Sequence, residues 1–172
     1  LPDLLTPADV GGDLHVHTDW SDGAASIAEM VAGAAEFGHD YVAITDHATG
    51  PGMVGGVGLD DDRLREQISA VREVAADASI EVFAGVEANV GTDGEVSVGD
   101  DLLADIDVVV ASPHAGLDGD GTDRLVTAAK QPHVDIIGHP TGRRLNERKG
   151  MDVDVARLAG VAADHETALE IN

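Results

Sequence analysis

Short apolar runs alternate with helix-like stretches along most of this 172-residue chain. Several runs are continuously apolar, which is typical of parallel strands buried on both faces of a sheet. Repeated strand–helix units of this kind build α/β folds with a parallel sheet. The runs that predict strands are residues 13–17, 41–45, 81–87, 107–112, 135–138 and 168–171.

The predicted helices lie between these strands. Ser26 and Glu29 form a capping box that begins an alanine-rich helix, which we expect to end near Gly38. A second helix is predicted at 60–76, where Leu64, Ile68, Val71 and Val74 follow helical spacing. Two glycine-rich segments are expected to be mobile surface loops. Two further helices are predicted at 122–130 and 152–163, and the two loops lie at 49–58 and 116–121.

Histidine and acidic residues fall where the predicted strands end. The carboxyl ends of parallel strands share one face of an α/β barrel or open sheet, and that face carries the active site. A single histidine is more often structural than functional. Their joint placement favours one shared site. The candidate residues are His15, His17, Asp22, His47, Glu87, His114 and His139.

The donor atoms of these residues favour a metal centre. His15 and His17 lie two residues apart, so both point to one side of an extended strand. A carboxylate such as Glu87, at the end of an apolar strand, is costly to bury unless it is paired or bound to metal. The chain has no cysteine, so imidazole and carboxylate must be the ligands, a set that suits zinc, manganese or iron.

Other residues near the predicted site have two open interpretations. Asp46 could orient the imidazole of His47, or it could serve as a strand-end hydrogen-bond partner or cap. Trp20 could touch a base or sugar, although packing against the rim is the favoured role. The remaining histidines precede strands, which predicts the opposite face and a structural or solvent-facing role. These are His39, His133 and His165.

Successive motifs resemble the PHP (polymerase and histidinol phosphatase) family. The resemblance spans residues 13–172 and leaves residues 1–12 as a leader. The leader and the His-Pro-Thr-Gly-Arg run make the chain most similar to the C-terminal PHP domain of bacterial and archaeal family-X DNA polymerases. The motifs are Asp-Leu-His-Val-His-Thr at 13–18, Ser-Asp-Gly at 21–23, Ile-Thr-Asp-His at 44–47, Gly-Val-Glu at 85–87, Ser-Pro-His at 112–114 and His-Pro-Thr-Gly-Arg at 139–143.

The resemblance implies a distorted (β/α)7 TIM-like barrel with two to three divalent ions, zinc, manganese or iron, in its mouth. Family members take two further ligands from an Asp-x-His motif near the last strand, and this sequence ends before such a motif. We therefore expect a fragment whose barrel is truncated before its last strand or strands. The resemblance assigns His15, His17 and Glu87 to one ion, Glu87, His114 and His139 to a second and catalytic one, and Asp22 with His47 to a third.

The implied activity is metal-dependent phosphoester hydrolysis at DNA 3′ ends: 3′-to-5′ exonuclease, 3′-phosphatase or abasic-site processing beside a polymerase domain of the same parent chain. A small-molecule phosphatase of the histidinol-phosphatase type and an inactive scaffold domain remain as alternatives. No Gly-x-Ser-x-Gly elbow and no Gly-Lys-Ser/Thr loop are present. Arg143 or Arg144 could fork hydrogen bonds to a substrate phosphate, and a solvated cationic loop is an equally good interpretation of either.

The charge balance is strongly acidic, with 33 acidic residues against 10 lysines and arginines. Lysine is scarce and aspartate abundant, which indicates adaptation to a salt-rich cytoplasm, where self-repulsion is screened. An ordinary acidic protein is the alternative. The charge disfavours duplex DNA binding by this domain alone. Apolar stretches are far shorter than the roughly 20 residues of a membrane helix, and no signal peptide is evident, so we expect a cytoplasmic protein without membrane contact.

Overall fold

The strands form one curled parallel sheet. The structure is a computed structural model that describes residues 4–50, 52 and 57–171. Within these residues the sheet has six strands, each paired in parallel with the next in chain order. The strands are β1 (Gly12–Val16), β2 (Tyr41–Ile44), β3 (Glu81–Asn89), β4 (Val108–Ser112), β5 (Ile136–Ile137) and β6 (Ala168–Leu169).

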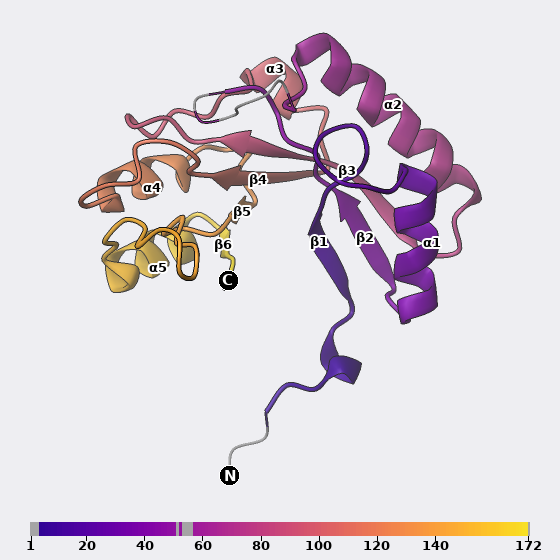
Figure 1. The fold of residues 1–172 in the computed structure, drawn as a ribbon, viewed down its shortest axis with the longest axis horizontal. Coiled ribbons are helices and arrows are strands. Elements are labelled where there is room, and N and C mark those ends of the chain that lie inside the picture. Colours follow the sequence, from indigo (N-terminus) through magenta and orange to yellow (C-terminus); the bar gives the residue numbers. More distant parts are fainter. Residues whose placement is uncertain (1–3, 51, 53–56, 172) are drawn as a thin grey trace.

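Helices surround the outside of the strands (Figure 1). The sheet curls, and β1 and β6 are its two edges in the described chain. The curled sheet confirms the prediction of a TIM-like α/β barrel that is truncated and therefore open within the described residues. The helices are α1 (Ile27–Phe37), α2 (Asp61–Asp77), α3 (Asp100–Leu103), α4 (Thr122–Ala128) and α5 (Val155–Asp164), and a 3-10 helix, η1 (Pro7–Asp9), precedes β1.

Local capping explains where the helices begin and end. The Ser26 side chain accepts a hydrogen bond from the Glu29 backbone, and Gly38 ends α1 with a left-handed backbone, φ 90°. The predicted start of α5 at residue 152 was wrong, because Asp154 caps the helix and its side chain accepts from the Arg157 backbone N–H. The short helix α3 was not predicted.

The two predicted glycine-rich loops differ in how far they are described. Residues 116–121 lie between β4 and α4 and belong to no helix or strand, as expected. Of the loop predicted at 49–58, residue 51 and residues 53–56 fall outside the described residues. The others belong to no helix or strand, and an isolated bridge between Ala48 and Leu59 joins the two sides of this loop.

Two apolar clusters hold the sheet in place. The larger lies between the strands and the helices and includes the fully buried Leu64, Val71 and Leu125. The smaller joins Ala43, Val108 and Val110 with the partly buried Leu14, Phe83 and Ile136. Because side chains alternate along a strand, Phe83 and Glu87 share one face of β3, which places the smaller cluster beneath the Glu87 site.

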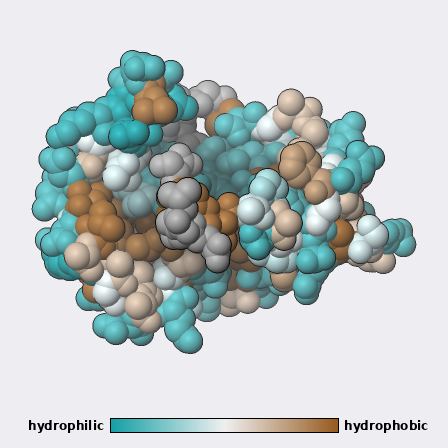
Figure 2. Space-filling view, turned by 90° about the horizontal axis from the view of Figure 1, so that it is seen from below, coloured by the Kyte–Doolittle hydropathy of each residue, from teal (hydrophilic) through white to brown (hydrophobic). Residues whose placement is uncertain are grey.

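The surface agrees with the acidic composition. Hydrophilic residues cover much of the face shown in Figure 2, and apolar residues form separate patches between them. The net charge of the chain is −23. Among the described residues, no helix has the length and apolar character needed to span a membrane.

Candidate metal centre

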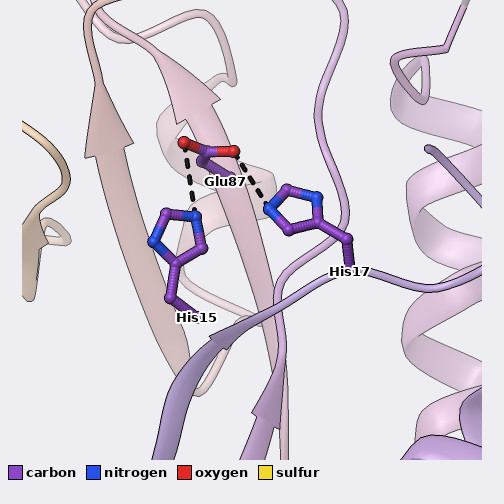
Figure 3. A group of neighbouring side chains, drawn as sticks. All are labelled: His15, His17 and Glu87. Carbon is purple, nitrogen blue, oxygen red and sulfur yellow. Dashed lines mark ion pairs between the residues drawn. The ribbon is translucent and has the colours of Figure 1, made fainter. Parts of the chain in front are cut away.

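The structure brings five histidines around the carboxylate of Glu87. Glu87 lies near the end of β3 and is 1% exposed. His15 lies in β1, and His17 directly follows that strand; both point toward Glu87 (Figure 3). The other three follow the carboxyl ends of further strands, as the sequence predicted. These are His47 after β2, His114 after β4 and His139 after β5.

Both carboxylate oxygens of Glu87 face imidazole nitrogens. Oε2 lies 3.3 Å from His17 Nε2 and 2.8 Å from His47 Nδ1. Oε1 lies 3.3 Å from the Nε2 atoms of His15 and His114, and 3.4 Å from Nε2 of His139. One acid is thus shared by five nitrogen donors that come from four different strand ends.

The spacing of these atoms suits bound ions better than direct hydrogen bonds. Charge-assisted hydrogen bonds are usually about 2.7–2.9 Å long, whereas most contacts to Glu87 measure 3.3–3.4 Å. Ligands held about 2.0–2.2 Å from one ion lie roughly 3.0–3.5 Å from each other. In addition, Glu87 Oε1 is buried and makes no hydrogen bond of acceptable geometry. The residues present therefore fit divalent ions.

The candidate residues form overlapping sets of ligand atoms, which include His47, Glu87 and His114. His15, His17 and Glu87 place ligand atoms within 4.8 Å of one another, and so do His17, Asp22 and His47. Asp22 Oδ1 lies 3.3 Å from His17 Nδ1, and Asp22 Oδ2 lies 3.5 Å from His47 Nε2. His114 Nε2 and His139 Nε2 are 3.3 Å apart, and both also face Glu87 Oε1. Each set could hold an ion.

Without ions, protons compensate the buried negative charge. Burial disfavours the charged form of Glu87, but the imidazoles in contact with its two oxygens hold the pKa of this carboxyl well below its ordinary value. Burial likewise opposes protonation of His15, but contacts with the carboxylates of Glu170 and Glu87 raise its pKa to about 10. The pKa of His47 is also raised, because its contact with Glu87 outweighs burial. Ions would have to displace these protons.

Glu170 belongs to the same cluster and was missed as a site residue. It directly follows β6, and its Oε2 lies 3.3 Å from His15 Nδ1 and accepts a 2.7 Å hydrogen bond from the His139 backbone N–H. His15, His139 and Glu170 form a further set that could hold an ion. The rule that identified the other candidates, an acid or histidine at a strand end, would have identified Glu170 as well.

Asp46 anchors the loop that carries Asp22. Its buried carboxylate accepts hydrogen bonds from the backbone and hydroxyl of Thr18, from the Ser21 hydroxyl and from Gln67 Nε2. No described hydrogen bond joins it to an imidazole, so of the two interpretations the strand-end hydrogen-bond role holds. Trp20 packs against the core, and the Arg63 guanidinium lies 4.4 Å from its ring centroid, as expected for a rim residue.

A cavity of about 710 Å³ opens over the histidine cluster. Arg143, Arg144 and Arg148 line it together with the candidate ligands. Lys149, which directly follows Arg148, is not part of this lining and pairs instead with Asp152 at 3.1 Å. The arginines thus line the same cavity as the candidate metal ligands, and a guanidinium can form two hydrogen bonds to a phosphoryl group.

The histidines expected to lie elsewhere do so. His39 lies before β2 and contacts the ring of Phe37, with 5.8 Å between centroids. His165 follows the last turn of α5. Neither these two nor His133 lines the cavity over Glu87.

Comparison with known proteins identifies relatives over nearly the whole chain. A family model described as "PHP domain" matches residues 13–172. A Bacillus subtilis protein named "DNA polymerase/3'-5' exonuclease PolX" is 38% identical over 174 residues, which cover 99% of this chain and 30% of that protein.

Shorter relatives carry a different name. A Caldicellulosiruptor bescii protein named "Probable phosphatase" is 34% identical over 93% of this chain and 64% of its own length. The Shigella flexneri "Probable phosphatase YcdX" is 29% identical over 93% of this chain and 63% of its own length. The chain thus spans less than two thirds of each of these relatives.

Proposed function

Because this chain belongs to the PHP domain family, we propose that it is a metal-dependent phosphoester hydrolase that processes DNA 3′ ends, with residues 13–172 as the catalytic domain and residues 1–12 as a leader. The observation that carries the hydrolase proposal is the convergence of five imidazoles on one buried carboxylate, Glu87, below a cavity lined by arginines. A scaffold domain has no need for such a costly buried charge.

Two to three divalent ions, zinc, manganese or iron, are the cofactors that this donor set suits. Glu87 would contribute to two of the ion sites, because its two oxygens face different histidines. The proposed sets are His15, His17 and Glu87 for one ion, Glu87, His114 and His139 for the catalytic one, and Asp22 with His47 for a third.

Clustered ions would supply an activated water near neutral pH and neutralise phosphoryl charge. The chain's own residues then hold the substrate. Arg143 and Arg144 extend from the β5–α5 loop into the cavity lining and can each fork two hydrogen bonds to phosphate oxygens. The chain contains no cysteine, so no thiolate nucleophile takes part. Glu87 keeps the imidazole nitrogens directed at one small volume.

DNA is the proposed substrate because the similarity to the Bacillus protein covers 99% of this chain. A polymerase domain in the same parent chain would then be the partner that delivers the 3′ end. Such a partner is needed on electrostatic grounds, because a net charge of −23 repels nucleic acid and local arginines alone cannot neutralise an extended phosphate backbone.

A second candidate is a small-molecule phosphatase. The relatives named as probable phosphatases match 93% of this chain and favour this alternative. A cavity of about 710 Å³ is also large enough for a small monoester. Substrate preference therefore separates the two candidates.

The test compares both substrate classes in one preparation. The full-length protein, purified in high salt with manganese, is incubated with 3′-labelled DNA, with 3′-phosphorylated DNA and with histidinol phosphate. Glu87→Gln keeps the side-chain shape and removes the shared charge, so it is the matched inactive control. We expect release of nucleotide or phosphate from DNA by the unmodified protein, and a loss of at least about 100-fold in the variant.

The outcomes separate the proposals. Turnover of histidinol phosphate alone would replace the DNA assignment by the phosphatase alternative. Absence of turnover on every substrate, in a folded protein that binds no metal, would contradict the hydrolase proposal and leave the scaffold alternative.

A further inference from the structure

Asn89 lies at the end of β3, two residues beyond Glu87. Side chains two residues apart share one face of a strand, so Asn89 faces the same interior as Glu87. It is fully buried, with 0% exposure. A buried amide must satisfy both its oxygen and its nitrogen, which makes its partners informative.

The partners of Asn89 fix the orientation of its amide. Nδ2 lies 2.9 Å from the backbone oxygen of Ala48, the residue after His47. A carbonyl oxygen can only accept, so the NH2 group must face it. Oδ1 therefore faces Nδ1 of His114 at 2.7 Å. Because Oδ1 can only accept as well, Nδ1 of His114 must carry the proton.

When the His114 ring is neutral, its other nitrogen then carries the lone pair. This atom, Nε2, lies 3.3 Å from Glu87 Oε1 and 3.3 Å from His139 Nε2, in the middle of the candidate metal centre. We propose that Asn89 is a positioning residue that holds His114 in the Nδ1-protonated tautomer, with Nε2 free to bind an ion. The metal-binding half of this inference rests on the proposed function.

The surrounding backbone holds Asn89 in this orientation. The β2–α2 loop packs directly on it: a side chain at Gly50 would meet Asn89 Nδ2 at 2.7 Å, and one at Gly52 would meet the His114 backbone at 2.7 Å. The Asn89 backbone N–H donates to Ser97 Oγ at 3.0 Å. Asn89 thus joins the residue after His47 to the ring of His114, and links two loops that carry candidate ligands.

The test reads the tautomer directly. The full-length protein is labelled with 15N-histidine, and long-range 1H–15N spectra of the metal-free form are recorded at increasing pH until the spectrum shows that the His114 ring is neutral. His114→Gln assigns the resonance of that ring. We expect a protonated Nδ1 and an unprotonated Nε2 at His114. Observation of the opposite tautomer in the unmodified protein would overturn the inference, whether or not the protein binds metal.

Variants test the role of the amide. Asn89→Leu has a similar size but no acceptor, and we expect a mixture of His114 tautomers and about 10- to 100-fold weaker binding of one zinc or manganese ion. Asn89→Asp keeps an oxygen toward Nδ1 and should restore the tautomer. Gln67→Leu removes another buried amide, which bonds to Asp46, and should leave the His114 spectrum unchanged.

An unaltered His114 tautomer in Asn89→Leu would contradict the proposal, as would an altered one in Gln67→Leu. If Asn89→Leu does not fold, the unmodified protein and Asn89→Asp still decide the tautomer. Failure of the unmodified protein to bind metal would contradict the proposed function instead, since the tautomer is read without metal.

Discussion

At the scale of single residues, the candidate metal centre depends on how the charge of the buried Glu87 carboxylate is compensated. A carboxylate with 1% exposure is stable only when its charge is compensated. Protons on neighbouring imidazoles provide this compensation without metal, as the raised pKa values of His15 and His47 indicate. Bound metal ions would compensate the charge of Glu87 in place of these protons, so protons and ions compete for the same imidazole nitrogens.

Metal binding should therefore release protons. The pKa of His15 is raised to about 10, so this ring carries a proton at pH 7.5 in the metal-free protein and must lose it to bind an ion. Affinity should rise as pH increases toward that value and fall as pH decreases. Calorimetry of manganese binding at pH 7.5, in buffers of different ionisation enthalpy, measures the released protons. Affinity that is independent of pH between 6 and 9 would contradict this competition.

The arginines over the cavity should act on substrate binding. Arg144 lines the cavity and pairs with Glu147 only at 3.4 Å, with both side chains 68% exposed, so it is available to a phosphate. Arg143→Ala or Arg144→Ala should raise KM about 10- to 100-fold, the cost of one charge-assisted hydrogen bond. Lys149→Ala is the control, because Lys149 lies in the same loop but does not line the cavity. Equal effects in all three variants would indicate only a general loss of positive charge.

At the scale of elements, parallel strand ends bring the site together, and hydrogen bonds fix the loops that follow them. β3 continues past Glu87 to Asn89, and a further bridge pairs His47 with Glu87. The loop after β1 is held by Asp46, which accepts from Thr18, Ser21 and Gln67. The position of Asp22 thus depends on a residue that does not itself reach the cavity.

Asp46→Ala should destabilise the fold. The substitution leaves buried donors on Thr18 and Gln67 without an acceptor, at a cost of roughly 2–4 kcal/mol. Urea denaturation of the metal-free protein measures this loss. Asp19→Ala, an exposed acid in the same loop, should change stability by less than about 0.5 kcal/mol. A similar small effect for Asp46→Ala would show that the loop is held by other contacts.

The sequence predicted elements well where local chemistry determines them. The Ser26 capping box and Gly38 fixed α1, and apolar periodicity located α2. The start of α5 was misplaced because several acids compete for the cap, and only the fold selects Asp154. Convergence of the candidate residues followed from parallel topology. Asn89 could not be assigned, because its role depends on a contact with His114, 25 residues away.

At the scale of the whole molecule, charge sets the conditions in which the fold is stable. The net charge is −23, and much of the face shown in Figure 2 is hydrophilic. Mutual repulsion of this size opposes compaction at low ionic strength. Molar salt shortens the Debye length to about 3 Å and screens it.

Stability should consequently rise with salt. Between 0.1 and 2 M KCl we expect the Tm to increase by about 4–8 °C, equivalent to roughly 2 kcal/mol for a domain of this size. Glu36→Lys with Glu73→Lys, two exposed positions on α1 and α2, changes the net charge by four, from −23 to −19, and should reduce the salt dependence. An unchanged or lower Tm in high salt would contradict the adaptation to salt that the composition indicates.

We expect the Glu87 cluster to hold divalent ions. Elemental analysis of the full-length protein, purified in high salt without chelator, measures this directly, with Glu87→Gln as the matched variant. We expect two or more bound zinc, manganese or iron ions per chain in the unmodified protein and at least one fewer in the variant. A folded, unmodified protein that binds none of these ions, even after incubation with each of them, would show that the Glu87 cluster is not a metal centre.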